Sequence, residues 1–495
     1  MKPKKRRSII RWGVVTLSIF MTNNTLLGVE SPNIIFILAD DLGYGETGFN
    51  GQQKIKTPNL DTMAREGAVF TDFYAGAPVC GPSRACLLYG LHTGNNPIRG
   101  NPTWTKSGKK PEMKPDDILI SHEMKRAGYS TAIFGKWGMN EVITNPETGD
   151  GVGHPLKQGF DEFVGFNTHG EAHFHWPDYY WDGYKKIDLS GGIKKANFKN
   201  RQTYADDIFQ KKALDYIDRK AGKEPFFIYL NYTIPHLGHT APQSSVDRYI
   251  NEGWPKKRGW SGGHYEMDEE VHTAYAGMIT HMDGYIGEIF FKLKEKGIAE
   301  NTLVFFTSDN GHEAKYQMFD SNGPLRGKKR DVTDGGIRVP TVAVWPKEIE
   351  PGRKISTPLA LWDVLPTLCE ITGIKPRTKT DGISFLPAIK GNMEQQQQHD
   401  VMYWEFNEIK GPMQAIRFGN WKAIRLWNMQ QQQLGPVQLY NLDTDIGEEA
   451  DLSDHYPEIV KTANKLFSEV RTEHPEWPLT LTENAKREIK KRKNK

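Results

Sequence analysis

Four stretches of the chain are almost continuously apolar and long enough to form strands. They cover residues 33–39, 130–135, 225–234 and 302–307. Apolar runs without polar alternation predict strands that are buried on both faces, as in parallel sheets. Helical stretches lie between them, among them residues 57–67, 206–220 and 271–296. Strands that alternate with helices predict an α/β fold with a large, mostly parallel sheet flanked by helices.

Beyond about residue 350 the pattern changes to shorter elements. Residues 361–369 predict a last helix of the main domain. The pattern predicts a small C-terminal subdomain with an antiparallel sheet and a helix. Its short strands are expected at residues 401–406, 414–418, 421–426 and 438–442, and its amphipathic helix at 456–472. We expect the main domain to span residues 31–375, the subdomain 376–480 and a basic tail 481–495.

The first thirty residues have the pattern of a signal peptide. A basic segment, residues 2–7, precedes a short apolar segment, residues 12–21. The apolar segment is too short to span a bilayer comfortably, so no stable membrane span is expected. We therefore expect export to the periplasm or the extracellular space. The alternative is that the segment stays uncleaved as a single anchor.

Charge and cysteine content exclude two classes of protein. The net charge is only +3, and much of the excess lies in the two tails. Without a basic body, a nucleic-acid groove is not expected. The three cysteines, Cys80, Cys86 and Cys369, are too few for a disulfide framework.

Polar side chains follow each of the four predicted strands. Ligands of open α/β sheets bind outside the carboxyl ends of the strands, so we expect these side chains to share one cleft. A single acid after a strand is usually a turn or cap residue, but four such strand ends in one chain favour a site. The side chains are Asp40 and Asp41, then Lys136, then His236, then Asp309 and Asn310.

The acidic members of this set are oxygen ligands with no thiol or imidazole among them. Such a set suits Ca2+ or Mg2+ far better than zinc. Three crowded carboxylates would repel one another unless a cation lay between them. An anionic substrate would then balance the nearby basic residues, which are Arg84, Lys136, Lys329 and His236. The sequence therefore indicates a sulfate or phosphate ester as substrate.

The segment that begins at Cys80 combines a cysteine with a helical apolar run. A lone cysteine is usually a buried core residue. However, Cys80-x-Pro82-Ser83-Arg84-x-x-Leu87-x-x-Gly90 resembles the signature of the type I, formylglycine-dependent sulfatases, which belong to the alkaline phosphatase superfamily. The resemblance runs from about residue 33 to the C-terminal helix. Supporting motifs follow in the family's order: Asp40-Asp41, Gly135-Lys136-Trp137, Pro235-His236, Asp309-Asn310-Gly311, and Leu325-Arg-Gly327 leading to Gly335-Gly336-Ile-Arg-Val-Pro340.

The resemblance implies an alkaline-phosphatase-like fold and a sulfuric ester hydrolase. It implies that a maturation enzyme converts Cys80 to formylglycine, whose hydrate attacks sulfur with one hydroxyl and expels sulfate with the other. It further implies one calcium ion, with magnesium as the weaker alternative. By resemblance, Asp40, Asp41, Asp309, Asn310 and the modified Cys80 bind the metal, Arg84 steadies the formylglycine, Lys136 and Lys329 hold the sulfate, and His236 is the general acid or a sulfate ligand.

Two positions need interpretation against the family pattern. Lys328 stands beside Lys329, and counting back from Asp334 selects Lys329 as the family lysine; the alternative is a solvated basic loop. Many relatives have a histidine base after Gly-Lys-Trp, where this chain has Gly138. Our hypothesis is that His173 takes that role. His169 and His175 are rivals, and a metal cluster or an inert surface loop are the other interpretations.

Residues 173–184 contain six aromatic side chains, which suit stacking on sugar rings but are as often core. With export, they favour a sulfated carbohydrate as substrate. Further candidates for the pocket wall are Trp404, Glu405 and His312. The alternatives are a phosphomonoesterase or phosphonate ester hydrolase on the same fold, or an inactive relative that binds sulfated glycans.

Overall fold

The computed structural model describes residues 31–493 apart from 103, 260–264, 266 and 314–315. The expected signal peptide, residues 1–30, lies outside this range. The chain from Pro32 onward forms one compact unit. None of its described helices combines the length and the apolar character needed to cross a bilayer.

All four predicted long strands are present, and they are neighbours in one sheet. They are β1 (Asn33–Ala39), β4 (Ser130–Lys136), β8 (Phe226–Asn231) and β9 (Thr302–Ser308). They lie in the order β9-β1-β8-β4, and each neighbouring pair is parallel. A fifth parallel strand, β5 (Glu162–Phe166), extends this row beyond β4. Their carboxyl ends therefore meet at one edge of the sheet.

Antiparallel strands flank this parallel centre, so the described sheet is mixed at its edges. On the β9 side lie β10 (Thr341–Val344), β2 (Ala68–Phe70) and β11 (Arg353–Ile355). On the β5 side lie β6 (Tyr179–Asp182) and β7 (Lys185–Asp188). A separate pair is formed by β3 (Phe73–Tyr74) and β12 (Leu359–Ala360). The predicted alkaline-phosphatase-like fold, with a large mostly parallel sheet, is confirmed.

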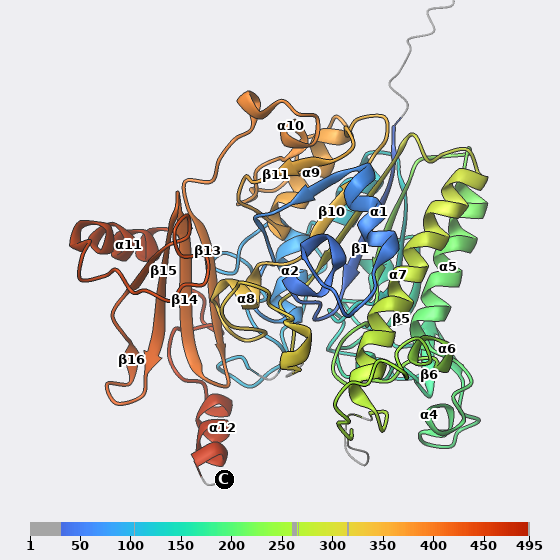
Figure 1. Cartoon of the computed structure of the whole chain (residues 1–495), viewed down its shortest axis with the longest axis horizontal. Helices are drawn as coiled ribbons and strands as arrows, with labels where there is room; N and C mark the ends of the chain where they lie inside the picture. Colours follow the sequence, from blue (N-terminus) through green and yellow to red (C-terminus); the bar gives the residue numbers. More distant parts are fainter. Residues whose placement is uncertain (1–30, 103, 260–264, 266, 314–315, 494–495) are drawn as a thin grey trace, which may run out of the picture. The chain divides into compact units, whose positions relative to one another are not determined.

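Helices cover both faces of this sheet, as Figure 1 shows. Ile35 and Ile37 of β1 belong to the core on one face, and Ile34 and Phe36 belong to the core on the other. This division explains the unbroken apolar pattern of the strand. The first face packs against α1 (Pro58–Glu66), α5 (Ala205–Lys220) and α7 (Val271–Glu295), and the second against α2 (Cys80–Tyr89), α3 (Ile120–Arg126), α9 (Val364–Ile371) and α10 (Leu386–Ile389).

The C-terminal part forms the predicted antiparallel sheet and helix. Its strands are β13 (Met402–Glu408), β14 (Gly411–Phe418), β15 (Trp421–Asn428), β16 (Gln433–Leu434) and β17 (Gln438–Asn441). One face packs on residues around α2, and the other is covered by α11 (Pro457–Glu469). The expected basic tail contains a helix, α12 (Glu483–Lys493). The domain boundary at residue 375 stays a prediction.

A buried group of charges joins the C-terminal sheet to the main sheet. Lys422 of β15 is fully buried and lies 2.5 Å from Asp334 Oδ1 and 3.5 Å from Glu448 Oε1. Asp334 begins α8 (Asp334–Ile337), and its backbone N–H donates to Glu448 Oε2 at 2.8 Å. Because α8 follows closely after Lys329, the C-terminal sheet supports the loop that carries that lysine.

Candidate active site

The four predicted oxygen ligands lie together at the carboxyl ends of β1 and β9. The backbone N–H of Asp41 donates to Asp309 Oδ1 at 3.1 Å, and Asn310 Nδ2 donates to Asp41 Oδ1 at 2.8 Å. Asp41 has a φ of +68°, in the left-handed region that non-glycine residues rarely adopt. Such strain of about 1–3 kcal/mol persists where the surroundings enforce it, as at functional sites.

Each carboxylate of this group is paired with one of the predicted cations. Lys136, Arg84 and Lys329 are all buried, so these pairs are shielded from water. The two lysines come from the end of β4 and from the loop before α8, and the arginine comes from α2. The pairs are Lys136 Nζ to Asp40 Oδ2 at 2.6 Å, Lys329 Nζ to Asp41 Oδ2 at 2.7 Å, and Arg84 Nε to Asp309 Oδ2 at 2.9 Å.

Two buried oxygens of this group have no hydrogen-bond partner among the described residues. They are Asp40 Oδ1 and Asn310 Oδ1. Buried polar atoms normally have partners, so these two indicate a missing ligand. A carboxylate oxygen of Asp40, one of Asp309 and the sulfur of Cys80 lie within 4.8 Å of one another. Oxygen donors around one point suit a hard divalent cation, so the residues fit calcium.

The pKa values of Asp40 and Asp309 are shifted in opposite directions. Burial raises the pKa of Asp40, but Lys136 and Arg84 outweigh it and lower the value to about 2. Burial and the nearby charge of Asp40 raise the pKa of Asp309 to about 7, although Arg84 opposes them. A divalent cation at this position would favour the charged form of Asp309, which is how a metal inverts local pKa values.

Cys80 is the first residue of α2, and its side chain is buried beside the carboxylates. The helix begins two residues before Pro82, which is therefore its third residue. Asn101 Oδ1 accepts from the backbone N–H of Gly81 at 3.0 Å and so satisfies one free donor of the helix start. Burial raises the pKa of the Cys80 thiol, but Lys136 and Lys329 bring it well below its usual value. The position therefore favours negative charge.

His169, one of the rivals of His173, lies beside Cys80. A Cβ atom on Gly138 would lie 2.8 Å from the Cε1 atom of His169, so the imidazole fills the space of the side chain that Gly138 lacks. Its Nδ1 lies 3.0 Å from Glu141 Oε1, and its backbone N–H donates to the same oxygen at 2.7 Å. Its Nε2 is buried without a hydrogen-bond partner among the described residues. An Nδ1–H bonded to a carboxylate leaves Nε2 as the proton acceptor.

Burial lowers the pKa of His169, but interactions with Cys80 and Glu141 outweigh it and raise the value to about 9. The Cys80 thiol therefore lies close enough to this imidazole for the two groups to shift each other's pKa. The geometry makes His169 the histidine best placed to exchange a proton with a group on residue 80.

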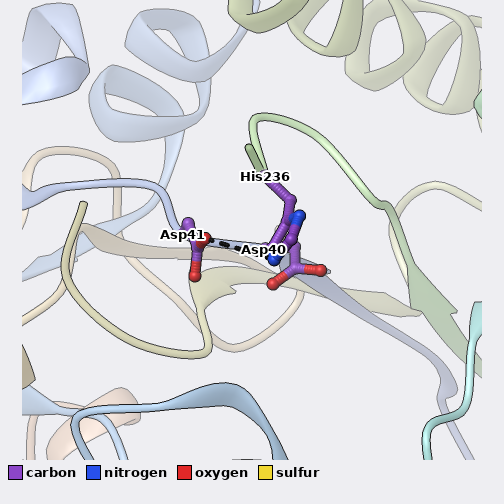
Figure 2. A group of neighbouring side chains, drawn as sticks. All are labelled: Asp40, Asp41 and His236. Carbon is purple, nitrogen blue, oxygen red and sulfur yellow. Dashed lines mark ion pairs between the residues drawn. The ribbon is translucent and has the colours of Figure 1, made fainter. Parts of the chain in front are cut away.

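His236 faces the carboxylates from the loop after β8, and Figure 2 shows it beside Asp40 and Asp41. Its Nε2 lies 3.7 Å from Asp41 Oδ2, and its Nδ1 lies 3.1 Å from the carbonyl oxygen of Leu237. Burial and the charges of Lys329 and Lys136 hold its pKa well below the usual value. His173 stacks on it, with ring centroids 4.9 Å apart and planes at 4°. His173 therefore contacts His236, the predicted general acid, whereas His169 fills the space beside Gly138.

The loop before α8 carries Lys329 into the site, as predicted. Besides Asp41, Lys329 Nζ donates to Glu313 Oε2 at 3.0 Å, and Arg330 pairs with the other oxygen of Glu313 at 2.5 Å. Lys328 instead lines a separate pocket of about 410 Å³ that also contains His312. The choice of Lys329 over Lys328 thus agrees with the geometry.

Trp404 and Glu405, the other residues proposed for the pocket wall, lie on β13. Trp404 is fully buried, and its Nε1 donates to the carbonyl oxygen of Ala75 at 2.9 Å. Glu405 forms ion pairs with Arg99 at 3.3 Å and Arg471 at 2.6 Å. Both side chains hold the C-terminal sheet in place. His175 is also structural, since its Nδ1 lies 3.0 Å from the Thr233 hydroxyl and its Nε2 3.1 Å from the His236 carbonyl oxygen.

Sequence reasoning missed Glu141 and Glu313, which orient His169 and Lys329. A carboxylate shortly after Gly-Lys-Trp is a signal that could have indicated Glu141. Glu408 was also missed: this buried carboxylate of β13 accepts from the backbone N–H of Asn101 at 2.9 Å. Asn101 in turn bonds Gly81, so the C-terminal sheet also supports the start of α2.

Comparison with known proteins agrees with this site. Residues 32–374 match the family described as Sulfatase, and residues 327–473 match the family described as N-sulphoglucosamine sulphohydrolase, C-terminal. N-acetylgalactosamine-6-sulfatase of Mus musculus is 30% identical over 417 residues, which cover 80% of this chain and 72% of that protein. Steryl-sulfatase of Mus musculus is 27% identical over 462 residues, covering 79% of this chain and 70% of that protein.

A solved structure gives the same result for the fold. The crystal structure of Ps i-CgsB in complex with k-i-k-neocarrahexaose has a TM-score of 0.73 and 27% sequence identity, and it covers 94% of this chain and 98% of that chain. The family match spans well over half of the chain, and it includes every predicted site residue. The chain therefore belongs to the sulfatase family of the alkaline phosphatase superfamily and is a sulfuric ester hydrolase.

Proposed function

We propose that this chain is an exported sulfatase that hydrolyses sulfate esters of carbohydrates with a formylglycine made from Cys80 and one bound calcium ion. The observation that carries the proposal is the position of Cys80, at the start of α2 and within 4.8 Å of oxygens of Asp40 and Asp309. A thiol is a poor ligand for calcium, whereas an oxygen in its place would complete an all-oxygen set.

The metal would be held by Asp40, Asp41, Asp309 and Asn310 together with residue 80. Two of their buried oxygens lack partners among the described residues, which supports this assignment. Bound there, calcium would supply positive charge to a sulfate oxygen. The hydrated aldehyde of formylglycine would supply the hydroxyl that attacks sulfur.

Two lysines bind and orient the anion. Lys136 and Lys329 reach the carboxylates from different elements, Lys136 at Asp40 and Lys329 at Asp41. Each ammonium has three donors, which allows bonds to a carboxylate and to sulfate oxygens together. Arg84 is fixed by Asp309 and by the carbonyl oxygen of Lys136 at 3.1 Å. Its role is to steady residue 80 and the metal ligands.

Two histidines move the protons of the reaction. His169 accepts the proton of the attacking hydroxyl at Nε2, while Glu141 holds its Nδ1 proton. His236 donates a proton to the leaving oxygen. Lysine charges depress the pKa of His236, and the negative charge of a bound sulfate ester offsets them and restores its affinity for a proton. His173 supports His236 through ring stacking.

The carbohydrate substrate and the exported location are supported by separate observations. Relatives include an N-acetylgalactosamine-6-sulfatase and a structure in complex with k-i-k-neocarrahexaose. Export rests on the basic and apolar segments of residues 2–21. A maturation enzyme that generates formylglycine is the partner that this proposal requires.

The test compares turnover of matched sulfate and phosphate monoesters by the purified full chain. We expect a higher kcat/KM for the sulfate ester. A clear preference for phosphate would contradict the proposal and favour the phosphomonoesterase alternative on the same fold. Sulfated saccharides that bind without turnover, together with an unmodified Cys80, would identify an inactive glycan-binding relative.

A further inference from the structure

A pocket of about 440 Å³ lies next to the stacked histidines. His173 forms part of its wall, together with the aromatic side chains of Phe174, Trp176 and Phe198. The turn before α4 (Ala196–Asn200) contributes two lysines, Lys194 and Lys195. The volume is within the range of small-ligand sites, about 300–1,000 Å³. The pocket is therefore large enough to bind part of a substrate.

One wall of this pocket continues into the active site. The His173 ring stacks on the ring of His236, whose Nε2 lies 3.7 Å from Asp41 Oδ2. The chain directly after His236 supplies Gly238 and Thr240 to the same pocket. A substrate whose leaving oxygen contacts His236 would thus extend its leaving group toward the pocket.

The acidic residues of the pocket are already used by its wall. The Glu171 carboxylate accepts from Tyr179 Oη and Trp181 Nε1, each at 3.0 Å, and from the backbone N–H of Thr168 at 3.0 Å. Asp178 Oδ2 accepts from the backbone N–H of Lys195 at 2.8 Å. Glu171 is therefore fully engaged, whereas Asp178 Oδ1 is buried without a hydrogen-bond partner among the described residues, and this oxygen lies in the pocket wall with the aromatic rings and the two lysines.

The lysines supply positive charge at the pocket. Lys194 is exposed and has no hydrogen bond or ion pair with any described residue. Lys195 has a φ of +61°, so the turn holds a left-handed conformation that brings the two lysines to the edge of the pocket. Aromatic faces bind the apolar faces of sugar rings, and lysine ammonium groups bind anions as point charges.

We propose that this pocket binds the sugar unit next to the one that loses its sulfate, and that Lys194 and Lys195 bind a second sulfate on that unit. The inference rests on the proposed function and names its substrate class. The enzyme acts on saccharides of at least two units that carry more than one sulfate.

The test uses the double variant Lys194→Met/Lys195→Met, which keeps the unbranched shape and most of the length of both side chains and removes their charge. Lys199→Met is the matched control, because Lys199 is an exposed residue of α4, the helix directly after the two lysines, and lies outside the pocket lining. The probes are a disaccharide with one sulfate on each sugar, the same disaccharide with only the scissile sulfate, and nitrophenyl sulfate.

We expect the KM for the disulfated disaccharide, relative to that for nitrophenyl sulfate, to rise about tenfold in the double variant at low salt. The ratio for the monosulfated disaccharide should change much less, and Lys199→Met should leave both ratios unchanged. The effect should shrink at high salt because exposed charges are screened. A change of equal size for both disaccharides, or no change for either, would overturn the proposal.

A binding measurement separates this inference from the proposed catalysis. Calorimetry of the disulfated disaccharide with Cys80→Ala requires no turnover and no modification of residue 80. We expect the Lys194→Met/Lys195→Met changes to weaken binding to Cys80→Ala about tenfold. Unchanged affinity would refute the second-sulfate site even in an active sulfatase. A weakened affinity in a chain that hydrolyses no sulfate ester would support the site and contradict the proposed function.

Discussion

The imidazole of His169 occupies the position that the missing side chain of Gly138 leaves open. A Cβ atom on Gly138 would lie 2.8 Å from Cε1 of His169, and Gly138 has a φ of +71°. Any other residue at position 138 would therefore strain the backbone and displace the ring. The two residues depend on each other: the glycine makes room, and the imidazole of His169 reaches that space from a different loop.

This relationship predicts different effects for two neighbouring histidines. His169→Ala removes the proton acceptor beside residue 80, so kcat should fall about 10²- to 10⁴-fold. His173→Ala removes a stacking partner of His236 and a wall of the adjacent pocket. It should mainly raise KM. Steady-state kinetics with a sulfated saccharide measure both effects.

The control for this comparison is the content of modified residue 80 and of calcium in each variant, both measured before kinetics. If His173→Ala lowers kcat as strongly as expected for His169→Ala, while His169→Ala stays active, then the original hypothesis for His173 is correct and the assignment of His169 is wrong.

Burial lowers the pKa of His169, and Glu141 is one of the two residues, with Cys80, that raise it, so its replacement should shift the pH profile. Its carboxylate raises the pKa of His169, so Glu141→Gln should lower that pKa. A base works when deprotonated, and activity rises as pH rises through its pKa. The acidic limb of the kcat/KM profile should therefore move to lower pH, with kcat about 10- to 100-fold lower because the ring is less well oriented. A limb that stays in place or moves to higher pH would contradict this role.

Removal of the metal should lower both activity and stability. Without the cation, the buried oxygens Asp40 Oδ1 and Asn310 Oδ1 have no partner among the described residues. A cation that binds only the folded state adds about 2.7 kcal/mol at a hundredfold excess over its Kd. Dialysis against chelator should therefore lower the Tm, and calcium should restore it better than magnesium.

The matched control for the metal is Asn310→Ala, which removes one of the predicted ligands. Its Tm should respond to calcium much less than the Tm of the unchanged chain. If neither chelator nor calcium changes the Tm or the turnover, the chain does not contain the metal site described above.

Replacement of Lys422, which lies at a distance from the predicted metal ligands, should cause a large loss of stability. Lys422→Met removes the nearest cation from the buried carboxylates of Asp334 and Glu448, and leaves Asp334 with Arg338, whose Nη1 lies 3.5 Å from Asp334 Oδ2. Breaking one partner out of a buried pair costs about 3–5 kcal/mol. The free energy of unfolding in urea measures the cost.

Lys410→Met is the control for that measurement, because Lys410 is half-exposed and pairs with Asp331 at 2.5 Å. An exposed pair contributes about 0–1 kcal/mol. Equal costs for the two variants would show that the buried group adds no more than a surface ion pair.

The sequence predicted the parallel centre of the sheet because its strands are buried on both faces. The apolar run from Ile34 to Ala39 has no polar position, since both sides of β1 pack against helices. The edge strands β2, β10 and β11 are only three or four residues long. Their pairing depends on distant segments, and no local pattern of that length distinguishes such a strand from a loop.

The site residues that lie at the ends of the parallel strands could be predicted from the sequence. Asp40, Lys136 and Asp309 follow parallel neighbours, so topology alone brings them together. The choice between His169 and His173 depends on how one loop folds over Gly138, and spacing of four residues does not determine that. Glu141 was missed for the same reason: its role arises from a contact across 28 positions of sequence.

Peptide mass spectrometry across Cys80 to Arg84 determines the chemical identity of residue 80, on which the proposed mechanism depends. The chain should be produced in its native host, so that the maturation enzyme is present. We predict a peptide in which the thiol of Cys80 has been replaced by an aldehyde or its hydrate, in a preparation that hydrolyses sulfate esters. An unmodified Cys80 thiol throughout a preparation with full sulfatase activity would contradict the account.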